Sequence, residues 1–190
     1  MSGWTPAPGS EAPPPLPLPA NALVMLVGAS GSGKSWWARR CFRETQVVSS
    51  DRCRALVSDE EENQTVNREA FAVFYEILRQ RLSLGRLTVA DSTALSGFIR
   101  ERMRLIAAQQ GIPVHVVVIH TPLEALRENN RARERRVPEH ILELHAQRFQ
   151  QLTEERVLEA EGYAAVHHVS MVMLPRLRPQ LLPATPASRD

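Results

Sequence analysis

Eight consecutive residues, GASGSGKS at Gly28–Ser35, have the composition of a loop that binds phosphate. They match the pattern G-x-x-x-x-G-K-[ST] in full and follow the apolar run Ala22–Val27 directly. Glycines let backbone N–H groups converge on phosphate oxygens, the Lys34 ammonium reaches the β- and γ-phosphates, and the Ser35 hydroxyl can ligate Mg²⁺. We therefore expect a nucleotide to bind here. The expected nucleotide-binding residues are Gly28, Ser30, Gly31, Ser32, Gly33, Lys34 and Ser35.

Lys34 is also the only lysine in the chain, because all the others among its 23 basic residues are arginines. A compact ammonium fits a crowded loop that a rigid guanidinium fork would not enter. We interpret Lys34 as a catalytic cation that acts on the phosphates.

A carboxylate stands at the end of a second predicted strand, where Asp51 follows Gln46–Ser50 (QVVSS). Phosphoryl transfer needs a group that orients the acceptor hydroxyl and accepts its proton, and Asp51 is placed for that role. Arg54 lies one turn later if a helix begins there, and it could neutralise acceptor phosphate or developing charge. An equally open alternative is that Asp51 only caps the next helix.

A second carboxylate, Asp91, ends the predicted strand Leu87–Ala90. In nucleotide-binding proteins a carboxylate at such a place holds Mg²⁺, directly or through water. We expect Ser35 and Asp91 to form the metal site. The alternative, a cap for the turn at Ser92 and Thr93, is as well supported.

The ten residues 127–136 carry five arginines and two glutamates. They follow the predicted strand Val114–Ile119 and lie between two predicted helices, where a lid could close over the phosphates. A lid arginine that meets the γ-phosphate would stabilise charge in the transition state and help to exclude water. The alternative is a solvated helix face with ion pairs at i and i+4.

Strand and helix signals alternate along the chain. Continuous apolar runs predict buried strands, and apolar residues at helical spacing predict helices. Strands are predicted at 22–27, 46–50, 87–90, 114–119 and 164–169, and helices at 34–42, 67–84, 97–110, 122–130 and 138–160. Thr121 to Glu124 has the form of a capping box at the start of the helix 122–130. This order predicts an α/β fold with a parallel sheet of about five strands flanked by helices, and a site at the carboxyl ends of the strands.

Prolines mark both ends of the chain, with seven between Pro6 and Pro19 and four between Pro175 and Pro186. We expect loose proline-rich tails at 1–20 and 173–190 around one folded domain at 21–172. A hydrophobic content of 43%, with 23 basic against 21 acidic residues, is typical of a globular domain. No apolar run could span a bilayer, the first 20 residues lack the features of a signal peptide, and two cysteines suit a reducing compartment. We therefore expect a cytoplasmic protein that does not bind membranes.

Three motifs carry a resemblance to a known family. GASGSGKS, the run VSSDRCRALVSDEEENQT at Val48–Thr65, and LTVADST at Leu87–Thr93 together resemble the kinase module of the bacterial end-healing polynucleotide kinase-phosphatase. The resemblance extends over about residues 23–166. That family consists of P-loop phosphotransferases of the AAA type, which phosphorylate 5′-hydroxyl ends of RNA or DNA with ATP and Mg²⁺.

The resemblance implies a P-loop kinase-like fold with an arginine-rich lid, and ATP and Mg²⁺ as cofactors. It implies that Lys34 and Ser35 serve ATP and the metal, that Asp51 is the general base, and that Arg54 contacts the acceptor phosphate. By alignment, Arg133 is the first choice for the catalytic lid arginine. Arg136 is the second, as a contact to the nucleotide.

The chain also departs from that family. Trp36 and Trp37 follow the loop serine where a threonine is usual, and these indoles could crowd the nucleotide or stack with a base. The phosphatase and ligase modules of the larger bacterial enzyme do not fit in 190 residues, so this chain either works with separate partners or acts on another acceptor. We expect an ATP-dependent kinase that phosphorylates a hydroxyl, with the 5′ end of RNA or DNA as the leading acceptor. The alternatives are a kinase for a small molecule such as a sugar, nucleoside or antibiotic, and a non-catalytic ATP-binding switch.

Overall fold

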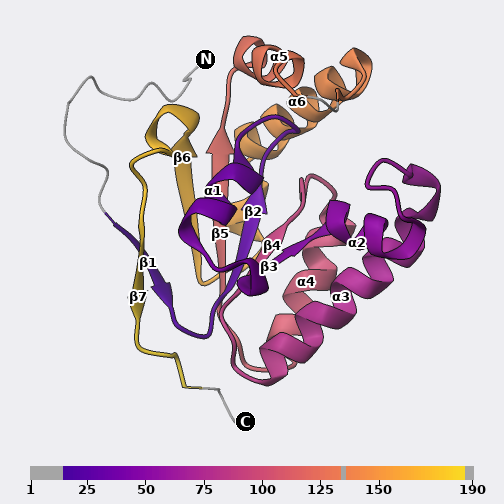
Figure 1. Cartoon of the computed structure of the whole chain (residues 1–190). Coiled ribbons are helices and arrows are strands. Elements are labelled where there is room, and N and C mark those ends of the chain that lie inside the picture. Colours follow the sequence, from indigo (N-terminus) through magenta and orange to yellow (C-terminus); the bar gives the residue numbers. More distant parts are fainter. Residues whose placement is uncertain (1–14, 134–135, 187–190) are drawn as a thin grey trace.

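Five parallel strands form the central sheet of the protein (Figure 1). The structure, a computed structural model, describes residues 15–133 and 136–186. The strands are β2 Leu23–Val27, β3 Val47–Ser49, β4 Thr88–Asp91, β5 Val114–His120 and β6 Ala165–Ser170, in the spatial order β3-β4-β2-β5-β6. The predicted α/β fold with a five-stranded parallel sheet is confirmed. Each predicted strand is present, with ends that differ by a residue or two.

Helices cover both faces of this sheet and its carboxyl edge. They are α1 Lys34–Cys41, α2 Ser50–Ser58, α3 Asn67–Ser83, α4 Gly97–Ala108, α5 Leu123–Arg131, α6 Glu139–Glu154 and α7 Val157–Ala160. In Figure 1, α3 and α4 lie on one side of the sheet, whereas α1 lies on the other and α5 and α6 stand above the strand ends. The loops at those ends are therefore enclosed by helices.

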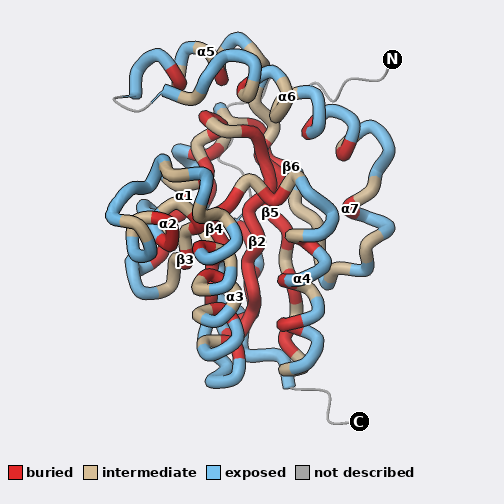
Figure 2. Tube along the Cα trace, turned by 90° about the vertical axis from the view of Figure 1, so that its right-hand side faces the viewer, coloured by how far each residue is buried: buried red, intermediate tan, exposed pale blue. Residues whose placement is uncertain are grey.

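The central strand β2 shows why the sheet has a core on each face. Side chains alternate along a strand, so Leu23, Met25 and Val27 pack with α3 and α4, whereas Val24 and Leu26 pack with α1. Figure 2 shows β2 buried along its whole length and β5 buried at most of its positions, between exposed helix surfaces. A strand buried on both faces reads as a continuous apolar run, and this is the pattern that made it predictable.

Two local expectations were wrong. Thr121 does not cap α5, because the helix begins at Leu123 and the Thr121 hydroxyl donates to the Ser32 carbonyl at 3.4 Å. The predicted helix 138–160 is two helices, because Arg156 adopts a left-handed conformation (φ 52°) that ends α6 before α7 begins. Helix α2 was not among the predicted helices, and a helix after Asp51 was considered only as the condition under which Arg54 would lie one turn later.

The segments expected as loose tails take part in the fold. Strand β1 Leu16–Pro19 pairs in parallel with β7 Pro179–Leu182, and Leu16 and Leu18 are buried. The Leu-Pro alternation places apolar side chains on one face and prolines, which lack an N–H donor, between them. Leu177 is also buried, and its carbonyl accepts a hydrogen bond from the Trp37 indole N–H at 3.3 Å. Residues 1–14 and 187–190 lie outside the described residues, so the expectation of tails stays a prediction there.

No helix within residues 15–133 and 136–186 is both long enough and apolar enough to cross a bilayer.

Candidate phosphate-binding and phosphotransfer site

The loop between β2 and α1 has a backbone that requires glycine. Gly31 and Gly33 have φ angles of 89° and 91°, in the left-handed region. A Cβ atom on Gly31 would lie 3.2 Å from the Leu126 carbonyl oxygen, because α5 packs directly on the loop. The same loop is tied to α5 by Asn129, whose side-chain amide donates to the Gly31 carbonyl at 2.9 Å.

Lys34 is buried at the start of α1 and turns back into the loop. Its ammonium donates to the carbonyls of Gly28 and Ala29, both at 2.7 Å, and to the Ser32 hydroxyl at 3.2 Å. Burial lowers the pKa of Lys34 to about 8, although the nearby carboxylate of Asp91 opposes the shift. The charged ammonium is thus available in the middle of the loop at neutral pH, where phosphates could replace its internal partners.

Ser35 and Asp91 lie together beside Lys34. Asp91 ends β4, and the Ser35 hydroxyl donates a hydrogen bond to its carboxylate. Burial raises the pKa of Asp91, while that hydrogen bond and the Lys34 charge act in the opposite direction. The Ser92 hydroxyl next to it is buried and has no hydrogen-bond partner among the described residues.

These oxygens fit Mg²⁺. Within residues 15–133 and 136–186, no three His, Cys, Asp or Glu side chains gather as a metal cluster. Magnesium does not need one, since it is usually held by one or two protein oxygens together with substrate phosphates and water. Ser35 and Asp91 supply that kind of donor set next to the phosphate loop.

Asp51 and Arg54 form an ion pair in the first turns of α2. The alternative that Asp51 caps this helix is wrong, because the cap is Ser49, whose hydroxyl accepts from the Arg52 N–H at 3.4 Å. The Asp51 side chain is 50% exposed, whereas that of Arg54 is only 8% exposed. The two members of the pair therefore have different surroundings.

Arg54 also holds the acidic segment after α2 in place. Its Nε–H donates to the Glu61 carbonyl at 2.8 Å, and Nη1 donates to the Asn67 side-chain oxygen at 3.1 Å. These contacts link α2 to the start of α3. They assign Arg54 a structural role besides the acceptor contact that the resemblance implies.

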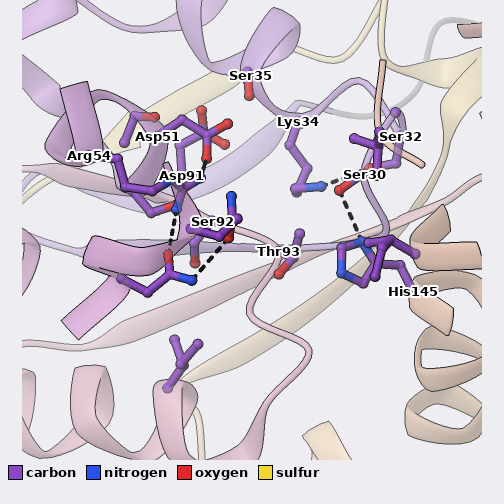
Figure 3. A pocket seen from close by; sticks show the side chains of 18 of the residues that line it. Ser30, Ser32, Lys34, Ser35, Asp51, Arg54, Asp91, Ser92, Thr93 and His145 are labelled. Carbon is purple, nitrogen blue, oxygen red and sulfur yellow. Dashed lines mark hydrogen bonds and ion pairs between the residues drawn. The ribbon is translucent and has the colours of Figure 1, made fainter. Parts of the chain in front are cut away.

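One cavity of about 500 Å³ brings most of the expected residues together. Its lining includes Ser30, Gly31, Ser32, Gly33, Lys34, Ser35, Asp51, Arg54, Asp91 and Arg133. Figure 3 shows Asp51, Arg54 and Asp91 on one side of Lys34, and Ser30, Ser32 and His145 on the other. Gly28 is absent from this lining and contributes its carbonyl to Lys34.

The arginine-rich segment divides between two roles. Arg133 lines the cavity, but Arg136 is exposed and does not line it. Arg127 forms ion pairs with Glu124, three residues earlier on its own helix, and with Glu139 and Glu143 on α6, so it differs from the predicted alternative of pairs at i and i+4. Residues 134 and 135 lie outside the described residues, and the closing lid stays a prediction.

Helix α6 contributes residues that the sequence reasoning did not assign to the site. Ile141, Leu144, His145 and Arg148 all line the cavity. Their spacing of three and four residues places them on one helix face. That spacing is visible in the sequence, but nothing there indicates that this face meets the phosphate loop.

The chain can now be compared with known proteins. A gluconokinase from Sinorhizobium meliloti 1021 matches with a TM-score of 0.54 and 16% identity, over 84% of this chain and 89% of that one. A chain of the Pnkp1/Rnl/Hen1 RNA repair complex matches with a TM-score of 0.60 and 20% identity, over 80% of this chain and 49% of that one. A chain of the PezAT chromosomal toxin-antitoxin system of Streptococcus pneumoniae matches with a TM-score of 0.51 and 14% identity, over 87% of this chain and 72% of that one.

These likenesses concern the fold, since all three identities are low. This chain spans about half the length of the RNA repair chain that it matches. No curated protein matches it in sequence. The sequence model of the AAA domain matches residues 23–152, which is more than half of the chain and includes the phosphate loop, Asp51 and Asp91. The protein therefore belongs to the AAA domain family and has a P-loop kinase-like fold.

Proposed function

We propose that this protein is an ATP- and Mg²⁺-dependent phosphotransferase that phosphorylates a hydroxyl, with the 5′-OH end of RNA or DNA as its acceptor. The observation that carries the proposal is the shared cavity. A half-exposed carboxylate, Asp51, lines it together with Lys34, Ser35 and Asp91. A protein that only binds nucleotide has no need of a carboxylate opposite the phosphate loop.

In this mechanism the loop N–H groups and Lys34 hold the β- and γ-phosphates of ATP. Ser35 and Asp91 would hold Mg²⁺, which when bound would neutralise charge on those phosphates. Asp51 orients the acceptor hydroxyl and accepts its proton. The acceptor oxygen forms a bond to the γ-phosphorus as the bond from that phosphorus to the β-γ bridging oxygen breaks, and ADP leaves. Arg133 contributes positive charge at the cavity for this step.

The chemistry of the cavity wall favours a nucleic-acid end as the acceptor. Apolar side chains of Phe71, Ile99, Ile141 and Leu144 form part of the lining. A nucleobase can stack on such a surface, and base stacking does not depend on sequence.

A small-molecule kinase is the second candidate function. A cavity of about 500 Å³ has the size of a small-ligand site. The fold also matches a gluconokinase over most of both chains. In the polynucleotide case, separate phosphatase or ligase partners would complete end healing, and one chain of similar fold belongs to an RNA repair complex.

A transfer assay tests the proposal and separates these candidates. The purified protein is incubated with γ-³²P-labelled ATP and Mg²⁺, and with 5′-OH RNA, 5′-OH DNA or a panel of sugars, nucleosides and aminoglycosides. We expect label on an oligonucleotide end, and none with Lys34→Ala. Label on a small molecule alone would support the second candidate. ATP binding without transfer to any acceptor would support a non-catalytic switch.

A further inference from the structure

Helix α6 directs one face at the phosphate loop. Leu144, His145 and Arg148 on this face line the same cavity as Lys34. The His145 Nδ1 atom lies 3.0 Å from the Ser30 hydroxyl oxygen, so the imidazole touches the loop directly (Figure 3). A titratable ring that the mechanism above does not use therefore lies within the phosphate site.

The ring is also close to the cation that would hold the phosphates. Burial lowers the pKa of His145, and the positive charges of Lys34 on α1 and Arg148 on α6 lower it further. The imidazole is consequently neutral at physiological pH while the loop is empty. When the Ser30 hydroxyl donates to Nδ1, the ring proton is on Nε2, and an Nε2–H group is a donor that a phosphate oxygen accepts.

Helix α6 is held near the phosphate loop by contacts that do not involve His145. Asn129 ties α5 to the Gly31 carbonyl at 2.9 Å. Arg127 then ties α5 to α6, with its Nε 2.5 Å from a Glu139 oxygen and its Nη2 2.8 Å from a Glu143 oxygen. The helix pair thus has its own attachment, and the ring at Ser30 is available for a ligand.

We propose that His145, which lies on α6 and faces the phosphate loop in the shared cavity, is a further contact for the phosphates of the donor nucleotide. This inference rests on the part of the proposed function that assigns nucleotide to the loop, and it is independent of the acceptor. Arriving phosphates bring negative charge that opposes the effect of Lys34 and Arg148, so they favour the imidazolium form. A charged donor then strengthens the hydrogen bond to phosphate.

Equilibrium binding of ATP in the presence of Mg²⁺ tests this contact without any acceptor. We expect His145→Gln to raise the Kd about tenfold, in line with the loss of one hydrogen bond to a charged group. His140→Ala removes an exposed histidine from the same helix and is expected to leave the Kd within about twofold of the wild-type value. Ser30→Ala, which leaves the ring without its anchor, is expected to weaken binding by an intermediate amount. Thermal unfolding without nucleotide shows whether each variant is folded.

The pH dependence of the same measurement separates a phosphate contact from a merely structural histidine. The ratio of the Kd of His145→Gln to that of the wild type cancels the titration of ATP itself. We expect this ratio to rise as the pH falls from about 7.5 to 5.5, because only the wild type gains an imidazolium. An unchanged Kd, or a flat ratio with a lowered melting temperature, would overturn the inference. Wild-type protein that does not bind ATP at all would overturn the proposed function as well.

Discussion

Asp51 and Arg54 form one ion pair, but the Asp51 side chain is half exposed and the Arg54 side chain is buried. The Asp51 side chain is half exposed and lines the cavity, where a substrate hydroxyl could reach it. Arg54 is enclosed by contacts to the Glu61 carbonyl and the Asn67 side chain. At the scale of single residues, Asp51 is the member of the pair that a substrate can reach, and Arg54 is the member that holds it in position.

This difference predicts a large effect on stability at Arg54. Arg54→Gln leaves the Glu61 carbonyl and the Asn67 amide oxygen without their donor, and we expect the free energy of unfolding to fall by about 2–4 kcal/mol. Arg52→Gln is the matched control on the same helix, because the Arg52–Glu44 pair is exposed. Its loss should leave the free energy of unfolding nearly unchanged, because solvent screens an exposed ion pair. Urea denaturation measures both, and equal losses would contradict a structural role for Arg54.

At the scale of elements, the strands and loops that could be predicted from the sequence are those that depend on a local residue pattern. Strand β2 was predictable because a strand buried on both faces is apolar throughout, and β5 because it contains the continuous apolar run Val116–Ile119. The phosphate loop was predictable because its glycines let backbone N–H groups converge on phosphate oxygens. Strand β1 was missed, since the Leu-Pro alternation of Leu16–Pro19 gains its meaning only from the distant β7. The contact of His145 with Ser30 joins residues 115 positions apart, and no local pattern records it.

Strands β5 and β6 also carry two histidine pairs that predict a pH dependence of folding. His115 lies 3.2 Å from His167 and His120 lies 2.8 Å from His168, measured between ring nitrogens. Burial, and then the partner ring, lowers the pKa of His115 and of His120 to about 4.

The unfolded chain takes up protons on these histidines near their ordinary pKa of about 6.5, before the folded protein does. The free energy of unfolding should therefore fall as the pH decreases from about 6.5 to 4, by roughly 1–2 kcal/mol for each pair after allowance for partial exposure. Urea titrations across this range measure the slope. We expect His115→Gln to reduce it and His140→Gln to leave it unchanged. A slope that His115→Gln does not alter would contradict this assignment.

At the scale of the whole molecule, segments near both ends of the chain close one face of the sheet. Leu18 from β1 and Leu177 beyond β6 share a core with Trp37 of α1, the helix that begins at Lys34. The phosphate loop thus depends for its support on residues that look dispensable in the sequence.

Leu18→Ala tests this support. The side chain is fully buried, so its truncation should lower the free energy of unfolding by about 2–5 kcal/mol. Leu181→Ala on β7 is the control, because that leucine is 56% exposed, and it should change stability by less than about 1 kcal/mol. Thermal or urea unfolding measures both variants. A Leu18→Ala protein as stable as the wild type would mean that β1 is not part of the cooperative fold.

The whole molecule is proposed to be a kinase in which Asp51 activates the acceptor, and one measurement tests this most directly. It is the rate of γ-phosphate transfer from ATP to 5′-OH RNA by the wild type and by Asp51→Asn, with the ATP Kd measured on both. General base catalysis contributes about 10²–10⁴ in rate, so we predict at least a hundredfold slower transfer with an ATP Kd within about threefold. Transfer by Asp51→Asn at the wild-type rate would contradict the role of Asp51 as the base.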